Sequence, residues 1–359
     1  MPLEADASAD VAVIGAGIAG CAVAYALARE GAKVIVLERD AIASAASGRN
    51  GGFILAGVVE NWVAACRRFG ADAARRVWQV TITDRALLRA AAGREGIECD
   101  LAWNGSEQLA GDGEEWAEIR ESAEQLRALG HRVAVDEAAR RVTFEEDGEM
   151  HPARFVRGLA DAAERLGARF HEGTPVARVG PAAVTAAGGT VTAASVVSCA
   201  NAYTRHLIAD TRIAPVRGQM LATAPIGRRI FPRPVYAHRG FRYWRQTRDG
   251  RVLVGGWRNT ALEAEVGEDA TPTDAVQRHL DAFLSEHGVR APVTHRWAGI
   301  MGFSHDGLPY IGRRADGVYV LAGFTGHGNA FAMAGGAIIA TLIRRGSHPD
   351  ADLFDPDRP

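Results

Sequence analysis

The chain has 359 residues, of which 47% are hydrophobic, so it is long enough for two domains with buried cores. Its formal net charge of -2 gives no broad excess of either sign, which argues against nucleic acid as the main partner and favours small molecules. The four cysteines are scattered without a C-x-x-C pair, so neither a zinc site nor a thiol-redox site is expected.

The first residues are acidic, with Glu4, Asp6 and Asp10 at or before the start of the first apolar run. A secretory signal opens with basic residues instead, so we expect a cytoplasmic protein. Two apolar stretches are long enough to be considered as membrane spans. Glycines interrupt the first, 11–28, and the second, 318–343, contains polar side chains whose burial in lipid would be costly. No membrane span is therefore expected.

The first elements predicted along the chain form a β-α-β unit. Residues 10–14 are a short apolar run that ends in glycine, residues 19–29 are alanine-rich without proline, and residues 33–38 are mostly apolar again. This order predicts strand, tight turn, helix and strand. Short, apolar strands are typical of a parallel sheet that is buried on both faces.

The turn of this unit carries the pattern G-x-G-x-x-G, formed by Gly15, Gly17 and Gly20. The first glycine permits the tight turn, the second lets a pyrophosphate approach the backbone, and the third lets helix and strand pack closely. The helix N-terminus offers free N–H groups to phosphates. Glu38 ends the second strand, where its carboxylate can accept hydrogen bonds from a ribose diol. We therefore predict a dinucleotide site.

Elements of a second kind follow. Residues 61–94 and 114–129 are predicted to be helical, and an amphipathic helix follows His151-Pro152. Strands are predicted at 168–171, 176–179, near 184 and 191, and at 196–200. Between 220 and 257 the pattern becomes aromatic and alternating, which favours a sheet of another kind. Because a strand at 318–322 and a helix at 330–344 return to the first pattern, the second domain is expected to be inserted into the first.

Several motifs follow the glycine turn in order along most of the chain. They are Ser47–Gly52, His151-Pro152, Ala200–Tyr203, Pro215–Gln219, Asp249–Arg251, Trp297–Gly299, Asp306–Gly312 and Gly323–Gly328. Together they resemble the D-amino acid oxidase-type FAD-dependent oxidoreductases, which include glycine oxidase and sarcosine oxidase. The Ser-Gly-Arg-Asn-Gly-Gly and Thr-Gly-His-Gly segments most resemble the gamma-glutamylputrescine oxidoreductase branch.

The resemblance implies an α/β fold, with an FAD/NAD(P)-binding Rossmann-like domain of the glutathione-reductase type and an inserted α+β substrate domain on a mostly antiparallel sheet. Residues 1–60, 141–215 and 295–359 would form the FAD-binding domain, and residues 61–140 and 216–294 the substrate domain. FAD would be held non-covalently, because Ile300 to His305 offer no cysteine where sarcosine oxidases carry one after their Trp-x-Gly segment.

The family's pattern also implies which residues contact FAD. Those at the ADP half are Gly15, Gly17, Gly20, Glu38 and Arg39, and those nearer the isoalloxazine ring are Ser47, Arg49, Asn50 and Gly51. Val176 would contact the adenine side through its backbone, and Ala200 would lie beside the diphosphate.

The turn Gly326-His327-Gly328-Asn329 precedes the last predicted helix and aims backbone N–H groups at whatever lies before it. Reduced flavin carries negative charge near N1 and the C2 carbonyl, so a helix N-terminus there raises its electron affinity. A plain capping turn is the alternative. His327 is either a neighbour of the flavin ring or a packing residue of the turn.

Candidate substrate residues come from the aromatic strand, where Tyr243 and Arg245 share one face. We expect Tyr243 to donate a hydrogen bond and Arg245 to pair with an anionic group; the alternative is that both are ordinary sheet residues. Met301 stands where glycine oxidase-like members place an arginine for the substrate carboxylate, so a simple α-amino acid is not favoured. The only lysine, Lys33, lies at the second strand, which leaves oxygen in doubt as the electron acceptor.

The expected function is oxidation of the C–N bond of a small amine or amino acid, by hydride transfer to flavin N5 and hydrolysis of the resulting imine. This chemistry depends on positioning and electrostatics, and no Ser-His-Asp, metal or paired-carboxylate pattern is found or needed. One alternative is a dehydrogenase that passes electrons to a quinone or protein acceptor rather than O2. The others are a non-catalytic flavin-binding protein and an NAD(P)H-dependent hydroxylase, although no second G-x-G-x-x-G is present.

Overall fold

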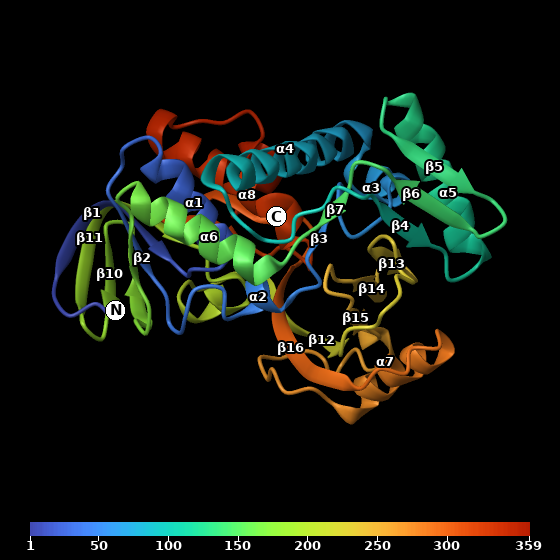
Figure 1. Cartoon of the computed structure of the whole chain (residues 1–359). Coiled ribbons are helices and arrows are strands. Elements are labelled where there is room, and N and C mark those ends of the chain that lie inside the picture. The colour runs from blue at the N-terminus through green and yellow to red at the C-terminus, as the bar shows by residue number, and fades with distance from the viewer.

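The computed structural model describes residues 1–359, with most strands in two sheets of eight strands each (Figure 1). In the first sheet, β1 (Ala7–Ile14) pairs in parallel with β2 (Val34–Leu37) and β11 (Gly189–Ser198). The outer strands of this sheet are β8 (Arg169–His171), β18 (Tyr319–Ala322), β17 (Tyr310–Arg313), β9 (Val176–Val179) and β10 (Ala183–Ala186). All four residues of β2 are buried, as a parallel sheet covered on both faces requires.

Three helices pack together on this sheet. Helix α1 (Ile18–Ala28) contacts both α6 (Pro152–Arg165) and α8 (Gly328–Arg345) (Figure 1). Because neighbours cover it on several sides, α1 is apolar all round and only Ala26 escapes full burial. Helix α6 begins at Pro152 with His151 as its N-cap, where the fixed backbone angle of proline suits the first helical turn.

The second sheet is mostly antiparallel, with one parallel pair between β4 and β13. In spatial order its strands are β16 (Val293–Ser304), β12 (Ile213–Thr223), β15 (Val252–Gly256), β14 (Arg242–Gln246), β13 (Val235–Ala237), β4 (Ser106–Leu109), β6 (Arg141–Phe144) and β5 (Val133–Asp136). Helix α7 (Asp274–Glu286) packs on β12 and β15, and α5 (Gly113–Ala128) on β5 and β6. Trp244, Trp257 and Phe283 belong to the apolar core of this part.

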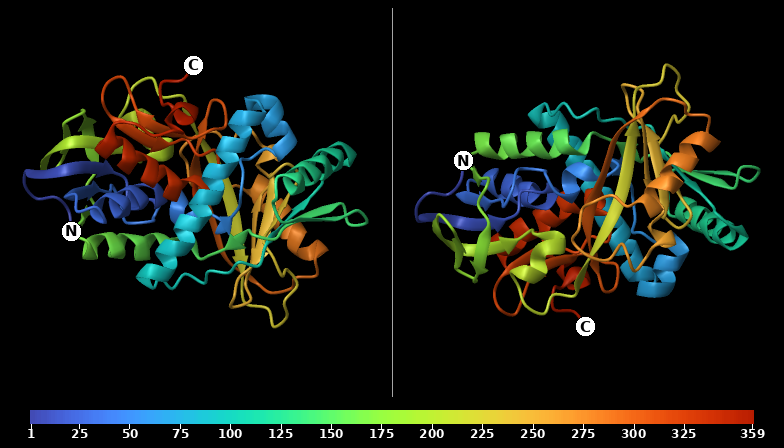
Figure 2. Two further views of the ribbon diagram at one scale, coloured as in Figure 1. Left: turned by 90° about the horizontal axis from the view of Figure 1, so that it is seen from above. Right: turned by 90° about the horizontal axis from the view of Figure 1, so that it is seen from below.

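The long strands β12 and β16 connect the two parts. Their register runs from Thr223 opposite Val293 to Ile213 opposite Ser304. At that end, Phe303 forms a bridge with Phe324, which follows the last strand of the first sheet. Figure 2 shows the two sheets side by side, with α4 (Ala71–Glu95) lying where they meet.

The structure changes two predictions about element boundaries. The helix predicted over 61–94 is two helices, α3 (Trp62–Phe69) and α4, because Gly70 takes a left-handed φ of 83° that ends the first of them. Residues 141–144, expected in the FAD-binding part, form β6 and pair with β4 and β5 of the second sheet. The short remaining elements are α2 (Ala46–Arg49), β3 (Phe53–Ile54), β7 (Gly148–Glu149), η1 (Asn201–His206), η2 (Arg258–Thr260) and η3 (Ala351–Phe354).

No helix combines the length and the apolar character that a membrane crossing needs.

One carboxyl group is buried where α4 packs on α8. Oδ1 of Asp84 accepts a hydrogen bond from the backbone N–H of Ala334 at 2.8 Å, while Oδ2 has no partner. Burial raises the pKa of Asp84 to about 8. The folded state therefore holds this proton over a pH range in which the unfolded chain has already lost it.

Stability is expected to fall as the pH rises from about 4 to about 8, because across that interval the folded state binds a proton on Asp84 that the unfolded chain has released. Asp84→Asn keeps the acceptor for Ala334 and cannot ionise, so its free energy of unfolding at pH 8 should exceed that of the parent by about 1–3 kcal/mol. Urea denaturation of both proteins between pH 5 and 9 measures this. Asp72→Asn, at an exposed site on α4, is the control. Parallel pH profiles for Asp84→Asn and the parent would contradict the assignment.

Candidate active site

The turn between β1 and α1 brings the three predicted glycines into one tight cradle. Gly15 has a left-handed φ of 96°, and a Cβ on it would lie 2.9 Å from the carbonyl oxygen of Cys199. A Cβ on Gly17 would lie 2.8 Å from Oγ of Ser47, and one on Gly20 only 1.8 Å from the carbonyl oxygen of Gly15. The first turn of α1 carries no acidic residue, so its N-terminus is free to face phosphates.

Glu38, which directly follows β2, lies at this cradle. Its carboxylate accepts hydrogen bonds from the backbone N–H of Ala16 at 2.7 Å and of Asp40 at 2.9 Å, which fixes it between the glycine turn and the end of β2. Arg39 is more exposed: it pairs with Asp40 at 3.0 Å and its guanidinium lies 4.6 Å from the ring centre of Tyr203.

Two further predicted cofactor residues lie around the same turn. Ala200 follows β11, and its Cα would lie 3.6 Å from a Cβ on Gly15. Val176 begins β9, two residues after Thr174, whose N–H donates to the carbonyl of Glu38 at 2.8 Å. The segment before β9 therefore passes beside Glu38.

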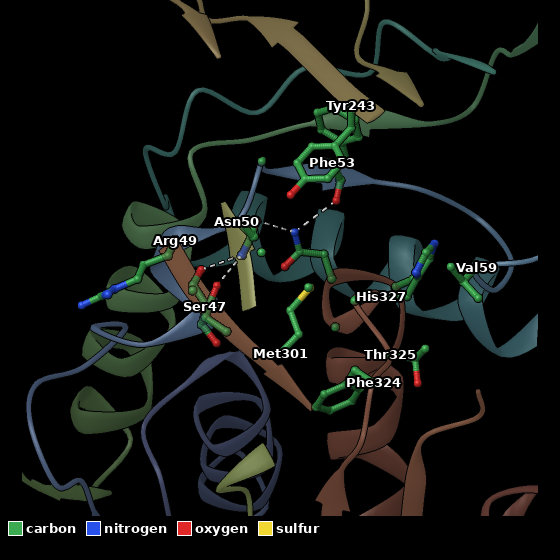
Figure 3. A pocket seen from close by; sticks show the side chains of 18 of the residues that line it. Ser47, Arg49, Asn50, Phe53, Val59, Tyr243, Met301, Phe324, Thr325 and His327 are labelled. Atoms are coloured by element: carbon green, nitrogen blue, oxygen red, sulfur yellow. Dashed lines mark hydrogen bonds between the residues drawn. The ribbon is translucent and has the colours of Figure 1, made fainter. Parts of the chain in front are cut away.

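Residues 46–52 link the cradle to the second sheet. Oγ of Ser47 accepts a hydrogen bond from the N–H of Ile18 at 2.9 Å, at the start of α1. Asn50 donates to the carbonyl of Ser47 at 2.8 Å and accepts from Nδ2 of Asn329 at 3.1 Å. Arg49 is among the residues that line the cavity, but its guanidinium donates to the carbonyls of Ala298 at 3.0 Å and Ser44 at 2.8 Å and extends away from Met301 and His327 (Figure 3). Ser47 and Asn50 thus tie α1, α2 and α8 together.

A single cavity of about 1440 Å³, its open mouth included, runs from this cradle to the second sheet. Gly17, Ile18 and Ser47 line one end of it, and Tyr243, Met301 and His327 line another part. Figure 3 shows Phe53, Tyr243, Met301 and His327 around the space, from four different segments. None of the 32 lining residues is an aspartate or a glutamate, so every charged side chain that faces the cavity is basic.

The predicted turn before the last helix faces this cavity. Gly326 has a φ of 85°, His327 is the N-cap residue of α8, and the helix starts at Gly328. Burial lowers the pKa of His327 to about 4, and its Nδ1 has no hydrogen-bond partner. His327 is therefore uncharged at neutral pH, and its ring lies edge-on to Tyr236 with centroids 5.9 Å apart. At this turn, the positive partial charge that a ligand would meet is therefore that of the N-terminus of α8 and not that of the imidazole.

The structure separates the two predicted substrate residues of β14. Tyr243 lines the cavity beside Phe53, with ring centroids 6.2 Å apart, and burial raises its pKa to about 12. Arg245 does not line it: its side chain is buried, pairs with Glu149 at 3.0 Å and donates to the carbonyl of Met150 at 3.0 Å and to that of Gly51. The expectation that Arg245 pairs with an anionic substrate therefore conflicts with its placement, because Glu149 already neutralises it.

Met301 lies on β16 in the cavity wall, where its Sδ would be 3.6 Å from a Cβ on Gly326. Arg258, which sequence reasoning missed, also lines the cavity. Its guanidinium carbon lies 4.6 Å from the ring centre of Phe241 and 4.9 Å from that of Phe303. The sequence signal was its position directly after the aromatic, alternating stretch 220–257, two residues beyond the glycine pair Gly255-Gly256.

A glycine turn of the Rossmann type, joined by one cavity to an antiparallel sheet, is typical of an oxidoreductase that uses a dinucleotide cofactor. The model of the FAD dependent oxidoreductase family (DAO) matches residues 10–342, and the chain belongs to this family.

Individual relatives agree with this family assignment. The chain is 28% identical to gamma-glutamylputrescine oxidoreductase of Escherichia coli (strain K12), over 98% of this chain and 87% of that protein. Its fold is similar to that of glycine oxidase from Geobacillus kaustophilus, with a TM-score of 0.84 at 22% identity over 98% and 99% of the two chains. L-proline dehydrogenase from P. horikoshii gives a TM-score of 0.81 at 24% identity over 99% and 98%. The predicted family, α/β fold and FAD cofactor are confirmed.

The residues around the glycine turn fit FAD. The cradle has no room for a Cβ on Gly20, the N-terminus of α1 is free of acidic side chains, and the cavity is continuous from there to Tyr243. Gly15, Gly17 and Glu38 would hold the ADP half, and the turn at 326–329 would face the ring system.

Proposed function

We propose that this enzyme holds FAD non-covalently and oxidises the C–N bond of a small amine or amino acid in the cavity. The observation that carries the proposal is the continuity of one cavity from the glycine cradle to the aromatic wall of the second sheet. Cys199 is the one cysteine among the lining residues and lies beside Gly15, at the end of the cavity where the phosphates would bind, which supports a non-covalent cofactor.

FAD supplies the acceptor for a hydride from the α-carbon of the substrate. The chain supplies position and electrostatics. Phe53, Phe241 and Phe303 line the cavity and would exclude water from the reacting atoms, and the N-terminus of α8 would favour negative charge on a flavin ring bound in front of it. Because His327 is uncharged at neutral pH, it does not repel a cationic amine. The imine is released to water for hydrolysis.

The electron acceptor is proposed to be O2 or, as the second candidate, a quinone or protein. No lysine lines the cavity, but this does not decide between the two acceptors, because Arg258 brings a positive charge to the cavity in place of a lysine. We propose a cytoplasmic location, no nucleic-acid partner, and the two-part division of the chain at the predicted boundaries, with residues 141–144 moved to the substrate part.

Anaerobic addition of a substrate amine or amino acid to the purified holoenzyme is expected to bleach the visible flavin absorbance, because the hydride is transferred to the flavin without oxygen. NADPH is the control and should leave the spectrum unchanged. Admission of air should then restore the colour if O2 is the acceptor; restoration only by a quinone assigns a dehydrogenase. If dithionite bleaches the flavin and no amine or amino acid does, the chain is a flavin-binding protein without this activity and the proposal is wrong.

A further inference from the structure

Arg258 differs from the buried arginines of this chain because it has no anionic partner. The arginines whose side chains are buried elsewhere each form an ion pair: Arg85 with Asp147, Arg217 with Glu265, and Arg245 with Glu149. Arg258 is half-buried in the cavity, where burial lowers its pKa, and no carboxylate is among the groups that act on its charge. A guanidinium cannot lose its proton, so partial burial without a counter-ion is unfavourable unless a ligand supplies one.

The surroundings of Arg258 leave its donors free. The ring centres of Phe241 and Phe303 lie 4.6 Å and 4.9 Å from the guanidinium carbon, within the range of a cation–π contact. Such a contact uses the π faces of the two rings and occupies no hydrogen-bond acceptor, so the N–H groups of the guanidinium stay available to a ligand. A carboxylate is the small anion whose two oxygens match that fork.

The backbone that carries Arg258 is held in an uncommon conformation. Trp257 has a left-handed φ of 59°, which bulky residues rarely adopt, and it follows Gly256 with a φ of 111°. The N–H of Trp257 donates to the carbonyl of Phe241 at 2.6 Å, and its side chain is buried in the core of the second sheet. This fixed turn at the end of β15 directs the next residue, Arg258, into the cavity. Strain of this kind is concentrated at ligand sites.

Two hydroxyl groups complete the arrangement. Tyr236 and Tyr243 line the same cavity, and burial raises the pKa of both phenols, so they stay protonated and can donate hydrogen bonds. Since no aspartate or glutamate lines the cavity, a second ammonium group on the substrate would find no counter-ion there. An anionic group would find the guanidinium of Arg258 and two phenolic donors, whereas Arg49, the other arginine of the lining, already donates to two backbone carbonyls.

We propose that Arg258 anchors a carboxylate of the substrate, with Tyr236 and Tyr243 as further donors, so that the substrate is an amino acid or an N-substituted amino acid rather than a diamine. This rests on the proposed function for the oxidation itself. It also revises the expectation drawn from Met301, because the positive charge missing from β16 is supplied by the end of β15.

Binding of unreactive carboxylates to the holoenzyme tests the anchor without turnover. Acetate, propionate and benzoate, each beside its uncharged amide, are titrated by calorimetry. At least one carboxylate should bind ten-fold or more tightly than its amide. Arg258→Met should raise the Kd of that carboxylate ten-fold to a hundred-fold and leave the Kd of its amide unchanged, and Arg258→Lys should raise the Kd of the carboxylate less. Arg228→Met, at an exposed arginine outside the cavity, should have the same Kd as the parent.

The rate of anaerobic flavin reduction tests the same anchor on reacting substrates. Proline and alanine are compared with pyrrolidine and ethylamine, which lack only the carboxylate, and with putrescine as the diamine. The parent should be reduced faster at low concentration by the acids, through a lower apparent KM. Arg258→Met should remove that preference, whereas Arg228→Met, outside the cavity, should keep it.

Two results would overturn the anchor: no carboxylate binds better than its amide, or Arg258→Met keeps the parent's preference. The first comparison needs only the parent protein, so it decides the matter even if the variant does not fold. Reduction by pyrrolidine, ethylamine and the acids alike would leave the oxidation intact and remove the anchor. Carboxylate binding through Arg258 without flavin reduction by any of these compounds would support the anchor and argue against the proposed oxidation.

Discussion

Gly20→Ala is expected to yield protein with little or no bound FAD. A Cβ at this position would lie 1.8 Å from the carbonyl oxygen of Gly15, and this atom belongs to the backbone of the turn that would cradle the pyrophosphate. Since no side chain can move aside, α1 must shift away from β1, at a cost on the order of 3 kcal/mol. If FAD binds only when α1 returns to its original position, the cost of that return weakens binding and raises the Kd for FAD by about 100-fold. Flavin content after purification and titration of the apoprotein with FAD measure it.

Gly93→Ala is the matched control for this substitution. Gly93 lies in α4, where a Cβ would meet no atom within 4 Å and the backbone is helical. Alanine at such a site should be neutral or should stabilise the fold by about 0.5–1 kcal/mol, with FAD content unchanged. A yellow Gly20→Ala protein with the parent's affinity would mean that the cofactor does not depend on the close approach of α1 to the turn.

The cofactor half of the site could be predicted from the sequence because its signal is local. Gly15, Gly17 and Gly20 are needed by one turn, and Glu38 follows after the single helix and strand of the same β-α-β unit. The spacing along the chain therefore determines the spacing in space. The resemblance to a family extended this to Ser47 and Asn50, whose contacts with α1 and α8 join segments that are far apart in sequence.

The substrate half could not be predicted in the same way, as two arginines show. Arg245 and Arg258 both follow a tryptophan at or near the end of a strand in the aromatic region. What separates them is Glu149, which pairs with Arg245 from 96 residues away in the sequence, whereas no carboxylate comes near Arg258. Strand alternation gives the face of a side chain, but the presence of a distant counter-ion depends on the tertiary fold.

Arg245→Met is expected to lower the stability of the protein by about 3 kcal/mol, because it leaves the buried carboxylate of Glu149 with only the half-exposed guanidinium of Arg229, at 3.5 Å, as a charged partner. It also removes donors to the carbonyls of Gly51 and Met150, which hold the segment after α2 against β7 and α6. Urea denaturation measures the loss, with Arg228→Met as the control for removal of an exposed charge.

The same variant separates the structural role of Arg245 from the role first expected of it. Glu149→Gln in the Arg245→Met background removes a buried charge that only Arg229 still pairs with, and should recover part of the lost stability. Because Glu149 neutralises Arg245 in the folded protein, Arg245→Met holoenzyme that remains folded should still prefer proline to pyrrolidine in flavin reduction. Loss of that preference at unchanged stability would instead identify Arg245 as the residue that binds the substrate's anionic group, and would move the anchor away from Arg258.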